Sequence, residues 1–64
     1  MEDVKELFAG NIGKRISITI LGQRGYIGGE VVAASENHVS LQVGETLIYV
    51  FYQSIILVEP SQKD

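Results

Sequence analysis

Side chains capable of chemistry are few in this sequence, and the most reactive combination centres on its one histidine. His38 lies close in the chain to Ser35 and Ser40, so a histidine base beside a serine nucleophile is the arrangement to consider. No pattern supplies a third group to orient the histidine, or an oxyanion hole. The 8 acidic residues are scattered, mostly at predicted turns and the termini. We therefore expect a protein that is not an enzyme.

A series of glycines between positions 22 and 29 is the second feature with a chemical interpretation, because glycine-rich loops can cradle phosphate groups. The series comprises Gly22, Gly25, Gly28 and Gly29. Its spacing fits neither GxGxxG nor the Walker pattern, and no helix is predicted to follow it. We interpret these glycines as bends and turns in the strands of a small sheet.

Length and composition narrow the possibilities further. A chain of 64 residues makes one domain near the lower limit for folding alone, and such domains usually need disulfides, a metal or partner subunits. Cysteine is absent and there is a single histidine, which leaves too few ligands for a structural zinc site. We expect no metal and no cofactor, so partner subunits are the natural source of additional stability.

The charge of the chain bears on its partners and its location. A formal net charge of -3 argues against non-specific binding to a phosphate backbone, although Lys14, Arg15 and Arg24 lie near the first predicted strand. No apolar run is long enough to cross a bilayer, and the acidic start of the chain does not resemble a signal peptide. We expect a cytoplasmic protein with no membrane association.

The elements that must position the candidate residues are one short helix and a set of strands. Apolar residues at helical spacing predict a helix over 2–9, with Gly10 as its C-terminal stop. Apolar residues that alternate with polar ones predict strands, first as a glycine-broken hairpin over 15–34 and then over 38–43, 46–52 and 55–59, with turns between them.

These elements predict a single, mainly β domain over 1–64. Residues 1–10 form its N-terminal helix, and five strands over 14–59 form a strongly bent antiparallel barrel. The helix is too short to persist alone, so its apolar stripe must pack on the sheet, and the open end of the barrel is the expected seat. Pro60 and the polar residues that follow, 60–64, end the fold.

The last two predicted strands are apolar on both faces. Leu47, Tyr49 and Phe51 fall on one face of their strand, while the opposite face is equally apolar. Such a strand needs cover on both sides, and this chain has little material to supply it. One interpretation is that the strands wrap tightly and the helix covers the surplus. We favour a subunit interface formed by edge pairing, which involves Ile48, Val50, Tyr52, Ile56 and Val58.

Three segments resemble the Sm-like (LSm/Hfq-like) family of small β-barrels. SITILGQRGYIGGEVVA at 17–33 is similar to the family's first long hairpin, where a glycine precedes a hydrophobic residue by two, here Gly29 and Val31. HVSL at 38–41 resembles the third strand, and YVFYQSIILVEPS at 49–61 resembles the closing strands. The resemblance implies an SH3-like or Sm-like barrel that assembles into a homomeric ring of roughly six or seven subunits.

The same resemblance implies a binding site for single-stranded RNA at the ring pore. The family's uridine pocket uses a polar residue and an aromatic residue from the turn into the third strand, which match Asn37 and His38 by position. Its basic residue and histidine before the last strand match Tyr52 and Gln53. Aromatic and amide side chains thus stand where the family has basic ones. The rings can stack on a base, and the amides can hydrogen-bond its edge.

Two hypotheses for function follow. The first is a ring-forming Sm-like protein that binds short single-stranded RNA at the ring pore through Asn37, His38, Tyr52 and Gln53. The second is a homo-oligomeric scaffold in which the same barrel mediates protein assembly without nucleic acid. The first predicts that a change at Tyr52 weakens a ligand site, and the second predicts that it disrupts the oligomer.

Overall fold

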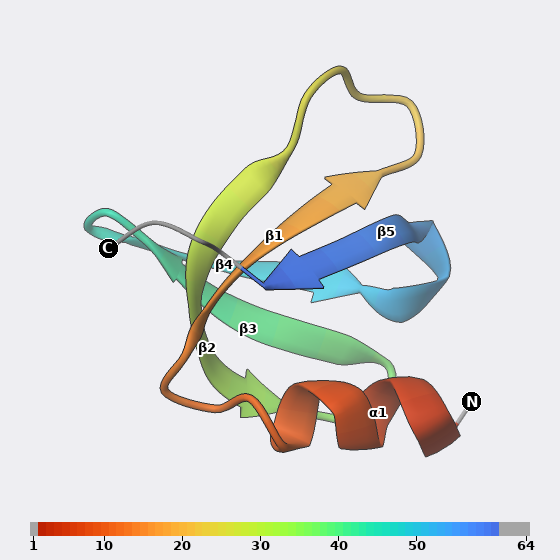
Figure 1. Cartoon of the computed structure of the whole chain (residues 1–64), viewed down its shortest axis with the longest axis vertical. Coiled ribbons are helices and arrows are strands. Elements are labelled where there is room, and N and C mark those ends of the chain that lie inside the picture. The colour runs from red at the N-terminus through yellow and green to blue at the C-terminus, as the bar shows by residue number, and fades with distance from the viewer. Residues whose placement is uncertain (1, 61–64) are drawn as a thin grey trace.

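The chain folds as a short helix packed against one strongly bent antiparallel sheet (Figure 1). This computed structural model describes residues 2–60. Its elements are α1 (Glu2–Ala9), β1 (Arg15–Ile20), β2 (Ile27–Ala34), β3 (His38–Val43), β4 (Thr46–Phe51), the short 3-10 helix η1 (Tyr52–Ser54) and β5 (Ile55–Pro60). The predicted mainly β fold, with a helix before five antiparallel strands, is therefore confirmed over this range. The part of the predicted tail at 61–64 lies outside the described residues.

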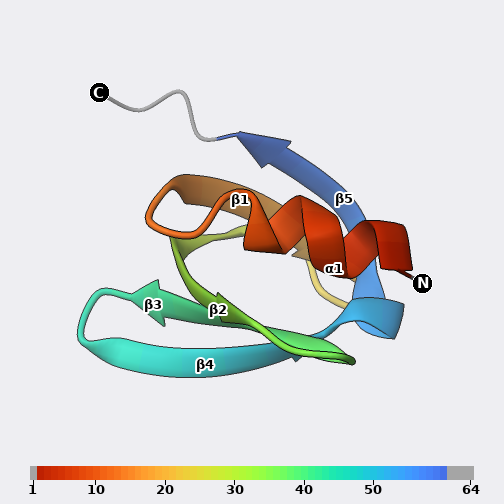
Figure 2. The same cartoon turned by 90° about the horizontal axis from the view of Figure 1, so that it is seen from below.

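The strand order shows that the sheet does not close into a barrel. Its order is β4-β3-β2-β1-β5, with every neighbouring pair antiparallel. Figure 2 shows β1 and β5 on one side and β3 and β4 on the other, with β2 curving between them. Because η1 carries the chain from β4 across to β5 instead of through a hairpin, these two strands form the two edges of the sheet. The expected barrel is thus open between β4 and β5.

The core lies inside this bend and is completed by the helix. Its buried apolar side chains are Phe8, Ile16, Ile18, Val31, Val39, Leu41 and Val50. α1 packs against β2 and β3 at one end of the bend (Figure 2), as its apolar stripe predicts. The helix ends at Ala9, directly before Gly10 as predicted, and two carbonyls of its last turn are satisfied: the Gly10 amide donates to Glu6 at 3.0 Å, and the Asn11 side-chain amide donates to Leu7 at 2.7 Å.

Gly29 is the residue that allows β2 to pass close to β3 within the bend. It is buried, and a Cβ atom built on it would lie 2.8 Å from the Gln42 carbonyl oxygen and 3.0 Å from Val43 Cγ2. The first of these neighbours is backbone and cannot rotate away. The neighbouring Gly28 meets nothing closer than 3.8 Å, so the two adjacent glycines differ sharply in what they tolerate.

We expect Gly29→Ala to destabilise the fold by about 1–3 kcal/mol, because an added methyl group in a packed interior forces the backbone to shift. Gly28→Ala is the matched control and should cost less than Gly29→Ala. Urea unfolding followed by circular dichroism measures both free energies of unfolding. Equal midpoints for the two variants would show that β2 has room at position 29.

Candidate functional site

A cleft of about 440 Å³ opens where the turn between β2 and β3 meets the connection from β4 to β5. Its lining residues are Val4, Glu36, Asn37, Phe51, Tyr52 and Gln53. Three of the four residues that the family resemblance implied therefore lie at one site, and the fourth, His38, lies beside it. A backbone hydrogen bond joins the two segments, because the Tyr52 amide donates to the Asn37 carbonyl at 3.1 Å.

Tyr52 is the residue that ties the walls of the cleft to the core. Its ring stacks on Phe8, with 5.6 Å between the ring centroids and 2° between the planes. Its hydroxyl donates a hydrogen bond of 2.6 Å to the Ser35 carbonyl. One ring face and the hydroxyl are thus engaged by the protein itself. Tyr52 joins α1, the turn at Ser35 and η1, and offers a ligand only its remaining surface.

Burial raises the pKa of the Tyr52 hydroxyl above its ordinary value of 10.0. The folded protein therefore keeps this proton at a pH where the unfolded chain releases it. The stabilising contribution is complete below pH 10 and is lost as the pH rises through the raised pKa of the folded state.

Tyr52→Phe should lower the free energy of unfolding by about 1 kcal/mol at neutral pH, because it removes a part-buried hydrogen bond. The difference between the wild-type protein and Tyr52→Phe should then shrink above pH 10. Urea unfolding at several pH values between 8 and 11 measures it, and titrating groups remote from position 52 contribute equally to both proteins. A difference that stays constant across this range would contradict the role given to the hydroxyl.

An ion pair stands at the rim of the cleft and links it to the helix. Lys5 Nζ lies 2.8 Å from Glu36 Oε2, with the two side chains 40% and 87% exposed. The hydrogen bond from Lys5 lowers the pKa of the Glu36 carboxyl, and the same bond raises the pKa of Lys5. Because the pair is exposed, its contribution to stability is small. Its effect is to place a carboxylate and an ammonium side by side at the cleft.

The His38 side chain lies in an aromatic cluster outside the cleft that the other three predicted site residues line. Its ring lies 5.2 Å from the Tyr49 ring in an edge-on arrangement and 5.8 Å from the Phe51 ring. Its Nδ1 lies 3.2 Å from Asn37 Oδ1. The pairing of β3 with β4 sets His38 opposite Phe51, so Phe51 belongs both to this aromatic cluster and to the cleft.

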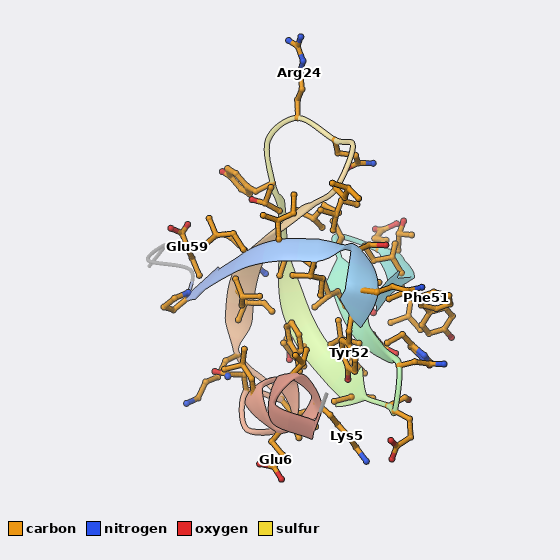
Figure 3. All side chains as sticks on the ribbon, turned by 90° about the vertical axis from the view of Figure 1, so that its right-hand side faces the viewer. Lys5, Glu6, Arg24, Phe51, Tyr52 and Glu59 are labelled. Carbon is orange, nitrogen blue, oxygen red and sulfur yellow. The ribbon has the colours of Figure 1, made fainter. Side chains whose placement is uncertain are left out.

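Sequence reasoning did not assign Val4, Glu36 or Phe51 to the site. Val4 belongs to the predicted helix and Glu36 to a turn, and neither position carries a local signal of binding. Phe51 carried two indications that it could belong to the site. It directly precedes Tyr52 in the sequence, and the alternation along its strand places it on the face opposite Val50. Figure 3 shows Tyr52 directed toward α1 and Phe51 directed outward from the same connection.

The predicted interface residues differ in how far the fold already covers them. Val50 is 6% exposed and belongs to the protein's own core, and Ile48, Tyr52 and Val58 are half-buried against that core. Ile56 is 61% exposed. The apolar side chains that remain open on the two edge strands are Leu47, Tyr49, Phe51, Ile56 and Leu57. α1 packs mainly against β2 and β3 and covers Tyr52 through Phe8, and it leaves these five side chains exposed in the single chain.

A second hollow runs along the open seam of the sheet. It has a volume of about 330 Å³ and is lined by Ile20, Ile27, Ile48, Tyr49, Val50, Phe51 and Ser54. These residues come from β1, β2, β4 and η1. The inner side of the β4 edge is therefore an apolar surface, next to backbone groups that no strand of residues 2–60 pairs on that side.

Among residues 2–60, no basic side chain lines the cleft, and Lys5 stands at its rim. Arg24 extends from the tip of the β1–β2 hairpin, at the opposite end of the molecule from α1 (Figure 3). Within residues 2–60, no helix has the length and apolar character needed to cross a membrane, and no group of three or more potential metal-ligating side chains gathers. No protein-family model matches the chain, and no curated protein matches it.

Proposed function

We propose that this protein is a cytoplasmic, Sm-like ring of roughly six or seven identical subunits that binds short single-stranded RNA at the ring pore, without catalysis. The observation that carries this proposal is the composition of the 440 Å³ cleft. It brings two exposed amide side chains, Asn37 and Gln53, beside the aromatic side chains of Phe51 and Tyr52. Amides hydrogen-bond the edges of unpaired bases, and aromatic rings stack on their faces.

The two open edges of the sheet support the assembly. An unpaired edge strand is a template for pairing with another chain, and β4 and β5 both present such an edge. If β4 of one copy pairs with β5 of the next, the contact is head-to-tail, and repeated contacts of this kind close into a ring when the rotation allows it. The exposed Tyr49 on β4, and Ile56 and Leu57 on β5, then become buried, while Phe51 stays at the cleft.

RNA binding is tested by fluorescence anisotropy with a labelled, unstructured RNA hexamer of mixed sequence at low salt. Gln53→Ala should weaken binding, because it removes one amide from the cleft. Gln23→Ala is the matched control, since Gln23 is an exposed amide in the hairpin loop outside the cleft. No binding by the wild-type protein, or equal weakening by both variants, would overturn the proposed RNA site.

The salt dependence of binding is a second readout of the same experiment. Lys5 is the basic side chain that residues 2–60 place at the rim of the cleft, so we expect few phosphates to be neutralised on binding. The affinity should change by about threefold or less between 50 and 200 mM salt. A much steeper dependence would place the RNA on Lys14, Arg15 or Arg24 instead.

The second candidate function is a homo-oligomeric scaffold that binds no nucleic acid. It is favoured by the exposed apolar face of β4, where Tyr49 is 63% and Phe51 51% exposed, and by the net charge of -3. Light scattering and RNA anisotropy on the same sample separate the two candidates. An oligomer that binds no RNA at low salt favours the scaffold.

A further inference from the structure

The rim of the cleft carries a specific arrangement of hydrogen-bonding groups. Glu36 lines the cleft, and its Oε2 accepts a hydrogen bond from Lys5 Nζ at 2.8 Å. A carboxylate accepts hydrogen bonds and an ammonium group donates them. A ligand that meets this rim therefore faces an acceptor with a donor directly beside it.

The four RNA bases match this arrangement to different degrees. Guanine presents two adjacent donors, N1–H and the N2 amino group, with the acceptor O6 next to them. Uracil presents one donor, N3–H, between two carbonyl oxygens, so a carboxylate that accepts from N3–H also meets an acceptor. Adenine and cytosine offer one amino group beside a ring nitrogen acceptor. Two parallel hydrogen bonds to one carboxylate are thus available from guanine alone.

The charge of the rim also decides which part of an RNA can enter. The paired carboxylate and ammonium carry no net charge, so the rim gives a phosphate no net attraction, whereas a base edge offers both donors and acceptors to the pair. Phe51 adds a ring that is 51% exposed and can stack on the face of an unpaired base. The cleft is therefore suited to a base that is turned away from its backbone.

Resting on the proposed RNA binding, we propose that the cleft selects guanine over uracil. The Glu36 carboxylate accepts from N1–H and the N2 amino group, the Lys5 ammonium donates to O6, and Phe51 stacks on the base. Asn37 and Gln53 hydrogen-bond the polar atoms of guanine outside its Watson–Crick edge. This preference differs from the uridine pocket that the family resemblance implies.

The test compares three labelled hexamers by fluorescence anisotropy at low salt. One is all uridine, one carries a single guanosine in the same background, and one carries inosine at that position. The guanosine hexamer should bind about tenfold more tightly than the uridine hexamer. Inosine lacks the N2 amino group and should lose most of this advantage.

Two variants assign the preference to the rim. Glu36→Gln replaces the carboxylate by an amide of the same shape and should reduce the guanosine preference to about twofold or less, because one of the two acceptors becomes a donor. Glu45→Gln makes the same change of charge at an exposed residue outside the cleft and should keep the preference. Both residues are exposed, so both variants should fold, which a thermal melt checks.

The outcomes separate the two proposals. Uridine binding as tightly as guanosine, or a full guanosine preference in Glu36→Gln, overturns the base selection and leaves RNA binding in place. No binding of any hexamer overturns the proposed function, and the base selection with it.

Discussion

Phe8→Ala is expected to abolish the cooperative unfolding transition of the protein, or to bring its midpoint close to room temperature. Phe8 is fully buried and is the residue through which α1 completes the core. Truncating a buried phenylalanine to alanine costs about 3–5 kcal/mol. At about 0.05–0.15 kcal/mol per residue, a domain of this size has a total stability of the same order.

The loss should exceed that of an ordinary core truncation, because Phe8 also supports the Tyr52 ring. Circular dichroism during thermal and urea unfolding measures the effect. Leu7→Ala is the matched control, since Leu7 lies on the same helix and is 48% exposed, and it should change the stability by less than Phe8→Ala. An unchanged melting temperature for Phe8→Ala would mean that the sheet folds without the helix.

Ile56→Lys is expected to convert the proposed oligomer to a monomer. Ile56 lies on the β5 edge and is 61% exposed in the single chain, so the proposed contact with β4 of another copy would bury it. A lysine there would lose its hydration inside an apolar interface, and edge lysines prevent strand pairing in natural sheets. The single chain should remain folded, because this side chain is outside the core.

The mass of the protein in solution, measured by light scattering at several concentrations, tests this prediction. Val32→Lys is the matched control. Val32 is an exposed valine on β2, 44% exposed, and β2 lies inside the sheet and not at its edge, so this variant should keep the mass of the wild-type protein. The prediction fails if Ile56→Lys has the wild-type mass, or if the wild-type protein is itself a monomer at high concentration.

Local patterns in the sequence were sufficient to predict most of the fold. The helix over 2–9 and the strand over 38–43 have the predicted boundaries, because apolar periodicity and flanking glycine or polar turns define both. The end of β4 was missed by one residue, since Tyr52 continues the apolar run but belongs to η1. What turns the chain there is a set of contacts with Phe8 and Ser35, and no local pattern encodes contacts with such distant residues.

The candidate site was only partly predictable for the same reason. Asn37, Tyr52 and Gln53 were placed together by the family resemblance, and periodicity alone would not have joined the two segments. Glu36 and Lys5 are separated by 31 positions and meet because α1 packs beside the turn between β2 and β3. The sheet is open between β4 and β5 because η1 carries the chain from one edge of the sheet to the other. The sequence pattern did not predict this crossover.

The stacking of Phe8 on Tyr52 has a consequence for synthesis of the protein. The first helix leaves the ribosome early, but its aromatic partner is added only after β4 is complete. In a nascent chain Phe8 therefore lacks this stacking partner until the segment after β4 has emerged. Contacts between positions so far apart in the sequence slow folding, so we expect the stacking of Phe8 on Tyr52 to be among the later contacts to form.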